Sequence, residues 1–301
     1  MTIAVPIRRP VRKGPSARPI GRWDAAASRH LAERLDRLAS AASDASDVTS
    51  ASDVASASDA ASTAFIATRL TDPDVRQRLA DYARLLLKWN RTFNLLGAAD
   101  PVALIDEHLI DALATLPALA RHLTGTAAPR LHDVGSGAGL PGIPLAIAWP
   151  ELPVVLIEPI GKKAAFLRQA IAELELSNVR VIEARLTPQL ALTDPGLVAA
   201  APSRLDSSQP VATERAVTPH FICRALTTLA DFAALCRPHV SDDSLLFAMK
   251  AIRTEHELAA LAPDIRVRAV ERLPVPAPGV DRRLVVLSYP ESNGDPEWRS
   301  S

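Results

Sequence analysis

The segment 131–142 reads Leu-His-Asp-Val-Gly-Ser-Gly-Ala-Gly-Leu-Pro-Gly and joins a short apolar strand to an apolar helix. Glycine at alternate positions, Gly135, Gly137 and Gly139, lets the backbone turn sharply and approach a ligand, because no Cβ blocks the approach. The unpaired N–H groups of the following helix then face that ligand. Glu158 ends the next apolar strand, where its carboxylate can accept hydrogen bonds from a ribose. Together these features predict a nucleoside-binding site.

Two ligand classes compete for this loop. Residues 137–142 match the G-x-G-x-x-G pattern of dinucleotide-binding enzymes, and Glu158 stands at about the distance which that pattern requires. Read from Asp133, the same segment matches the D-x-G-x-G-x-G loop of class I methyltransferases. Asp133 can help bind the amino-acid part of S-adenosylmethionine, and Pro141 stiffens the loop after Leu140, which favours the second class. The loop and the acid alone leave NAD and S-adenosylmethionine both open.

Composition narrows the class of protein. The chain has 301 residues, of which 48% are hydrophobic, which suits one good-sized domain with appendages. No apolar run approaches the ~20 residues that span a bilayer, and no apolar segment follows the basic N-terminus as a secretory signal requires. We therefore expect a cytoplasmic protein, with Cys223 and Cys236 as free buried thiols. The histidines show no ligand spacing, so no metal site is predicted.

The N-terminal part divides by composition. Residues 1–63 combine a basic, Pro-containing arm with an Ala/Ser/Asp repeat over 41–63, which predicts a disordered arm and linker. A short helix at 24–40 would be marginal alone. We expect deletion of residues 1–63 to leave activity intact. Apolar residues at helical spacing predict a helical cap over 64–127.

Strands and helices then alternate through a predicted catalytic domain over 128–290, before a tail at 291–301. We expect strands at 130–134, 153–158, 179–183, 209–213, 244–249, 265–272 and 283–288, and helices at 142–149, 162–175, 218–237 and 254–261. Such alternation predicts a mostly parallel α/β sheet with helices on both faces. Only a Pro/Gly-rich loop over 274–279 separates the last two strands, so they should form an antiparallel C-terminal hairpin. This is the class I methyltransferase variant of the Rossmann-like fold.

The sequence resembles one family, the RsmG (GidB) methyltransferases. The strongest block runs over 133–167 and includes the glycine loop, Leu-Ile-Glu at 156–158 and Lys-Lys-Ala-Ala-Phe-Leu at 162–167; Lys-Trp-Asn at 88–90 adds to it. The resemblance implies an enzyme that transfers a methyl group from S-adenosyl-L-methionine to N7 of a guanine in small-subunit (16S) rRNA. It implies small-subunit rRNA or the ribosomal subunit as partner, and we expect a cytoplasmic monomer.

The resemblance also assigns individual residues. It places Gly135, Leu140, Leu186, Thr187 and Arg215 at the cofactor, together with Asp133, Gly137 and Glu158. Lys162, Lys163 and Lys250 are expected to contact RNA phosphates as point charges. The chain departs from the family where Arg-x-Glu becomes Arg-Leu-Thr at 185–187 and where Ser-Arg-Ala becomes Glu-Arg-Ala at 214–216. Guanine N7 carries a lone pair and no proton, so the implied mechanism is positioning, with no catalytic base.

Two other functions stay open at this point. An NAD-dependent oxidoreductase should carry a Tyr-x-x-x-Lys pair, but the only tyrosines are Tyr82 and Tyr289 and neither has that spacing. A non-catalytic RNA-binding protein with a relic cofactor site is motivated by the departures at Thr187 and Glu214.

For several residues of the predicted cap we expect a structural role. We expect Trp89 in the core, Asn90 and Asn94 in loop hydrogen bonds, and Asp111 beside His108.

Overall fold

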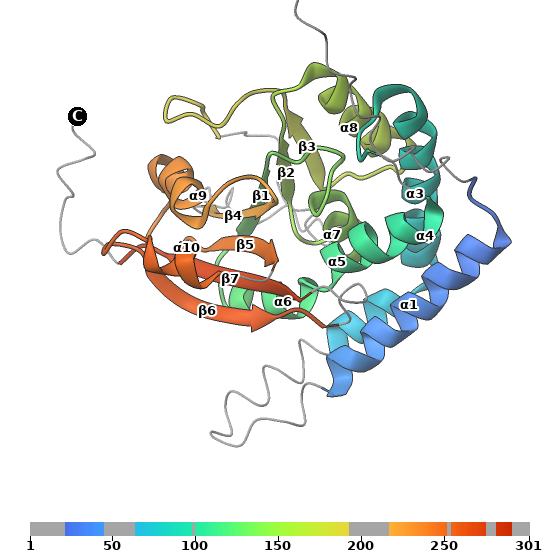
Figure 1. The fold of residues 1–301 in the computed structure, drawn as a ribbon, viewed down its shortest axis with the longest axis horizontal. Helices are drawn as coiled ribbons and strands as arrows, with labels where there is room; N and C mark the ends of the chain where they lie inside the picture. Colours follow the sequence, from blue (N-terminus) through green and yellow to red (C-terminus); the bar gives the residue numbers. More distant parts are fainter. Residues whose placement is uncertain are drawn as a thin grey trace, which may run out of the picture.

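The computed structural model describes residues 22–44, 64–97, 100–192, 217–251, 254–274 and 281–290, and its centre is a seven-stranded sheet (Figure 1). The strands are β1 (Pro129–Val134), β2 (Val154–Ile157), β3 (Val179–Ile182), β4 (Thr218–Arg224), β5 (Leu246–Ala251), β6 (Arg266–Arg272) and β7 (Arg282–Ser288). Their order is β3-β2-β1-β4-β5-β7-β6. Strands β1 to β5 are parallel, whereas β7 runs antiparallel to both β5 and β6. The predicted class I methyltransferase sheet and its C-terminal hairpin are therefore confirmed.

Helices cover both faces of this sheet. They are α7 (Gly142–Ala148), α8 (Gly161–Glu173), α9 (Leu229–Cys236) with the 3-10 turn Arg237–His239, and α10 (Glu255–Ala259). Successive strand residues point to opposite faces, so Leu156 joins the buried cluster under α7 and α8, and Ile157 joins the cluster under α9. No helix in the described ranges is long and apolar enough to cross a bilayer.

The helix predicted at 218–237 is wrong in its first part, where β4 lies instead. Phe221, Ile222 and Cys223 are buried in the middle of the sheet, because β4 pairs with β1 on one side and β5 on the other. A central parallel strand is buried on both faces, so its apolar residues run continuously and mimic a buried helix. The strand predicted at 209–213 lies outside the described residues.

The N-terminal helices pack on one side of the sheet. They are α1 (Ala25–Asp44), a helical stretch over 64–71, α3 (Pro73–Phe93), α4 (Pro101–Leu104), the π-helical turn η2 (Ile105–Leu109), α5 (Ile110–Leu113) and α6 (Leu116–Leu123). Asp72 caps α3 by accepting the N–H of Asp74, and Pro73 occupies the first helical position.

Helix α1 confirms the short helix expected at 24–40 and extends it to Asp44, inside the segment predicted as a disordered arm and linker. Leu31, Leu35 and Leu38 are buried on one of its faces, and α1 contacts α3, α4, η2 and α5 (Figure 1). Sequence alone underestimates the stability of such a helix, because most helical stability in proteins comes from tertiary packing. Residues 1–21 and 45–63 lie outside the described part of the chain.

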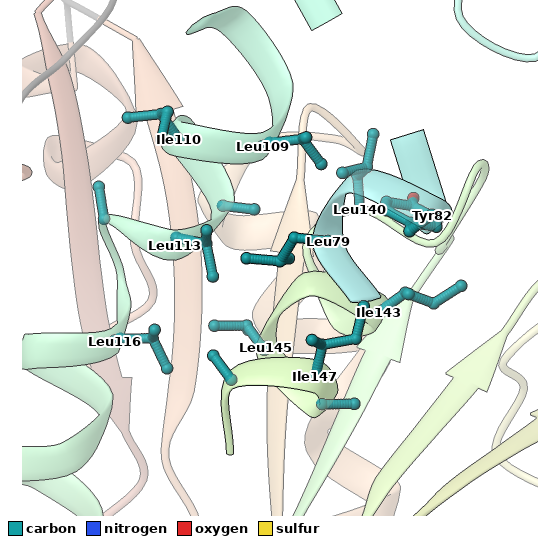
Figure 2. Packing of buried hydrophobic residues seen from close by; sticks show 14 of the residues in the cluster. Leu79, Tyr82, Leu109, Ile110, Leu113, Leu116, Leu140, Ile143, Leu145 and Ile147 are labelled. Atoms are coloured by element: carbon teal, nitrogen blue, oxygen red, sulfur yellow. The ribbon is translucent and has the colours of Figure 1, made fainter. Parts of the chain in front are cut away.

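The cap and the sheet share one core. Figure 2 shows side chains of α3, η2 and α5 facing those of the glycine loop and α7. The labelled members are Leu79, Tyr82, Leu109, Ile110, Leu113, Leu116, Leu140, Ile143, Leu145 and Ile147. This packing fixes the cap against the loop that the sequence singled out.

Candidate cofactor-binding site

The glycine loop follows β1 and enters α7. Gly135, Gly137 and Gly139 have φ angles of 72°, 61° and 85°, a region that side chains rarely adopt. A Cβ on Gly139 would lie 2.5 Å from Ile143 Cδ1, so internal packing also requires glycine there. Beside Gly137, in contrast, the nearest atom to a Cβ would be the Gly135 carbonyl oxygen at 3.8 Å. The loop therefore packs against the side chain of Ile143 at Gly139, whereas at Gly137 there is space for a ligand to approach the backbone.

Glu158 reaches this loop directly from the end of β2. Its Oε2 accepts the N–H of Gly137 at 2.8 Å, and its Oε1 accepts the N–H of Ile160 at 2.8 Å. The carboxylate is only 3% exposed. Each oxygen retains a second lone pair. The glycine loop and Glu158 are therefore in direct contact, and they meet at Gly137, where a ligand has space to approach the backbone.

Asp133 lies fully buried under the loop. Its Oδ2 accepts the N–H of Gly142 at 3.0 Å, whereas its Oδ1 has no hydrogen-bond partner among the described residues. Burial raises the pKa of Asp133 to about 7, although the Gly142 N–H and the charge of Arg224 act in the opposite direction. A buried acceptor without a partner costs about 1–3 kcal/mol. Oδ1 is therefore an acceptor that the described residues leave unsatisfied, and it lies beneath the loop, closed to solvent.

An arginine that the sequence analysis did not single out, Arg224, stands at the end of β4. Arg215 lies outside the described residues, and β4 begins after it, at Thr218. The sequence Cys-Arg-Ala at 223–225 thus occupies the strand end to which the resemblance assigned Glu-Arg-Ala at 214–216. The cofactor role of Arg215 therefore stays a prediction, and Arg224 is a second candidate at this edge of the sheet.

The loop after β4 borders the same site. Ala225 has a φ of 50°, which is strained for a residue with a Cβ. Leu226 follows it, remains 38% exposed and rests on Gly135: a Cβ there would lie 2.6 Å from Leu226 Cδ1. This loop therefore delivers an apolar side chain to the edge of the glycine loop.

Three predicted cofactor residues, Leu140, Leu186 and Thr187, are held by packing or by a backbone hydrogen bond. Leu140 is buried in the core (Figure 2) and is joined to Pro141 by a cis peptide bond. Leu186 is buried among Val134 and Ile157, and the Thr187 carbonyl faces His239 Nε2 at 2.9 Å. Leu186 can meet a ligand through its backbone only.

The predicted RNA-binding lysines differ in setting. Lys162 is exposed at the start of α8, and its Nζ donates to the carbonyl of Phe93 at 3.4 Å; Lys163 beside it is half-buried. Lys250 Nζ instead donates to the Thr227 carbonyl at 2.5 Å and pairs with Glu257 at 2.7 Å. Lys250 is therefore held in an ion pair rather than presented on an open surface.

The expectations for the cap hold with one change. Trp89 packs edge-on against Phe166, with ring centroids 5.6 Å apart. Asn90 donates to the Gly97 carbonyl and accepts the Leu96 N–H, and Asn94 ends α3 in the left-handed conformation. Outside the cap, Cys223 of β4 and Cys236 of α9 are free and buried, as expected.

The change concerns His108, which contacts Arg224 and not Asp111. Arg224 Nη2 lies 2.5 Å from His108 Nδ1 and Nη1 lies 3.5 Å from Asp111 Oδ2. Sequence spacing cannot show that an arginine from β4 enters between two cap residues.

Tyr82 is a further residue that sequence reasoning missed. It is fully buried in α3, and its hydroxyl donates to the Ala138 carbonyl at 2.6 Å. In the sequence, Tyr82 simply joins the helical row of core residues.

Comparison with known proteins places these features in a family. A family model described as rRNA small subunit methyltransferase G matches residues 75–286. A "Ribosomal RNA small subunit methyltransferase G" from Azoarcus sp. (strain BH72) is 39% identical over 70% of this chain and 86% of its own length. A protein of the same name from Burkholderia ambifaria (strain MC40-6) is 36% identical over 77% of this chain and 91% of its own length.

Likeness to solved structures is more distant. TrmN from Thermus thermophilus aligns over 62% of this chain and 53% of that chain, with 18% identity and a TM-score of 0.40. The strand order of the sheet, rather than this score, identifies the fold.

Proposed function

Because this chain belongs to the rRNA small subunit methyltransferase G family, we propose that it transfers the methyl group of S-adenosylmethionine to N7 of a guanine in small-subunit (16S) rRNA. The observation that carries this proposal is the direct hydrogen bond between Glu158 and Gly137 in the glycine loop. The NAD-dependent alternative has no support in the family match. The family match does not support the relic-site alternative either.

The described residues fit the proposed cofactor. S-adenosylmethionine supplies the methyl group on a sulfonium, and its amino-acid part carries an ammonium and a carboxylate. Glu158 would hold the ribose, and the open backbone at Gly137 allows close approach. Asp133 is fully buried, so it would help to bind the amino-acid part by holding the loop through the Gly142 N–H. Arg224 would suit the carboxylate, because a guanidinium donates two parallel hydrogen bonds. Gly135 and the backbone of Leu186 and Thr187 would complete the contacts.

The reaction needs alignment more than proton transfer. Guanine N7 would form a bond to the methyl carbon with its own lone pair while the sulfur–methyl bond breaks, so that the sulfonium becomes a thioether and the positive charge passes to the guanine. No proton has to leave N7, so no side chain has to act as a base. His108 agrees with this assignment, because its Nδ1 is occupied by Arg224. Holding the guanine in line would supply most of the acceleration, and such positioning is worth up to ~7–11 kcal/mol.

The RNA has to present an unstacked guanine to this edge. Lys162 and Lys163 at the start of α8 would meet its phosphates, with a contribution that weakens as salt rises. The chain would work as a cytoplasmic monomer on small-subunit rRNA or on the subunit.

A transfer assay tests the proposal. Small subunits from cells that lack this protein are incubated with the full chain and methyl-labelled S-adenosylmethionine, and the rRNA is mapped by mass. We expect label in 16S rRNA as 7-methylguanosine. Label in protein only, or no label with subunits and with naked rRNA, would contradict the proposal.

A further inference from the structure

Four polar side chains meet where the cap contacts the carboxyl edge of the sheet. Asp111 of α5 is 4% exposed and pairs with Arg224 of β4, Oδ2 to Nη1 at 3.5 Å, and with Arg282 of β7, Oδ1 to Nε at 3.2 Å. His108 of η2 contacts Arg224 from the other side at 2.5 Å. We call His108, Asp111, Arg224 and Arg282 the cap cluster.

The cap supplies the acceptors for Arg224. A guanidinium has donors only, so His108 Nδ1 accepts, and its imidazole is neutral with the proton on Nε2. Burial, aided by Arg224 and Arg282, lowers the pKa of His108 to about 4, which keeps the ring neutral. The Glu107 carbonyl accepts from Nη1 at 3.4 Å. Residues of η2 and α5 thus restrain both terminal nitrogens.

The guanidinium also lies near Asp133, beneath the loop of the proposed cofactor site. Strand β4 lies beside β1, with Ile222 opposite Asp133, and the charge of Arg224 lowers the pKa of Asp133. The Arg224 side chain keeps 18% of its surface exposed. A long arginine at a strand end has many rotamers, and losing them costs ~1.5–2 kcal/mol.

We propose that Asp111 and His108 are positioning residues, which hold the Arg224 guanidinium ready at the cofactor edge, so that the cap contributes to cofactor affinity. This inference rests on the proposed function. A purely structural role is the competing explanation, because breaking any buried ion pair destabilises a protein. The cluster itself provides the control, since Asp111 has two arginine partners and only Arg224 lies on the strand beside β1.

The experiment compares Asp111→Asn with Arg282→Met in the full chain. Asp111→Asn removes the charge that both arginines contact, whereas Arg282→Met removes only its own contact and leaves the Asp111–Arg224 pair in place. The dissociation constant for S-adenosylmethionine is measured by calorimetry, and the unfolding midpoint is measured beside it. We expect Asp111→Asn to weaken binding about tenfold, whereas Arg282→Met changes it less than about twofold. Both variants should lower the unfolding midpoint.

A second pair of variants tests His108 and remains available if Asp111→Asn does not fold. His108→Asn places an amide oxygen near the position of Nδ1, and His108→Leu removes the acceptor. We expect the asparagine variant to keep most of the affinity and the leucine variant to lose it.

Equal affinity changes within each pair would overturn the positioning role, even if both variants lose stability. If the unaltered chain bound no S-adenosylmethionine, the proposed function would fail and this inference with it. Normal binding by the unaltered chain with unchanged binding by Asp111→Asn and His108→Leu would overturn this inference alone.

Discussion

Tyr82 of α3 ties the helical cap to the glycine loop, because its buried hydroxyl donates a hydrogen bond to the Ala138 carbonyl at 2.6 Å. Ala138 lies between Gly137, whose N–H binds Glu158, and Gly139, which packs on Ile143. Burial raises the pKa of Tyr82 well above 10, so the hydroxyl remains a donor. The conformation of the loop therefore depends on the cap as well as on β1.

Tyr82→Phe should destabilise the protein by about 1–3 kcal/mol, because it leaves the Ala138 carbonyl unpaired in the core. It should also weaken S-adenosylmethionine binding by loosening the loop. Denaturant unfolding and calorimetry measure the two effects. Tyr289→Phe is the matched control: Tyr289 donates to the Ala233 carbonyl at 2.8 Å, away from the glycine loop. An equal loss of cofactor affinity in both variants would contradict this account.

Truncation tests the role of α1. Removing residues 1–21 should leave stability unchanged, whereas removing residues 1–44 should cost several kcal/mol, because each buried leucine of α1 contributes about 1.5–3 kcal/mol. The deletion also removes Arg34, whose Nε lies 2.7 Å from Asp106 of η2. Thermal unfolding of the two truncated chains measures the difference. If both unfold like the full chain, α1 is dispensable, as the sequence alone suggested for residues 1–63.

Buried neutral histidines predict loss of stability in acid. Burial lowers the pKa of His132 to about 3 and that of His220 to about 4. The unfolded chain therefore takes up protons near pH 6.5 while the folded protein does not, and stability falls from about pH 6.5 towards pH 4. Asp133 has the opposite effect on stability, because its pKa in the folded protein is raised to about 7. Its contribution to the free energy of unfolding is fully present below about pH 3.8 and is lost as the pH rises through 7.

His220→Asn isolates one of these histidines. His220 Nδ1 accepts the N–H of Leu245 at 3.1 Å, and an amide oxygen can accept the same bond. Between pH 6 and pH 5, the slope of unfolding free energy against pH should fall by up to about 1.4 kcal/mol per pH unit, since one proton fewer is taken up on unfolding. Urea unfolding across this range measures the slope. The exposed His256 provides the control variant His256→Asn, and an equal change in slope there would count against the assignment.

The sequence predicted the parts of this molecule that depend on local signals. The glycines after β1, the acid after β2 and the period of the α7 and α8 residues each carry their own physical reason, and the structure brings the first two into contact. The C-terminal hairpin was predictable because residues 274–279 leave no room for a crossover helix.

The parts that sequence did not predict depend on tertiary contacts. The continuous apolar run of β4 predicted a helix, because sequence does not show that β1 and β5 bury both of its faces. Arg224 at the end of this strand was therefore not considered for the site. Helix α1 has little predicted stability by itself, and sequence does not show that its leucines are buried against the other helices of the cap. The cap cluster joins residues from η2, α5, β4 and β7, which no spacing rule connects.

The central claim is that the glycine loop and Glu158 form a site for S-adenosylmethionine, and calorimetry of the full chain with this ligand tests it most directly. The account predicts one bound molecule per chain, no heat with NAD, and binding at least about tenfold weaker in Glu158→Gln, with the exposed Glu173→Gln unchanged. Binding of NAD in place of S-adenosylmethionine, or equal affinity in the Glu158→Gln variant, would contradict it.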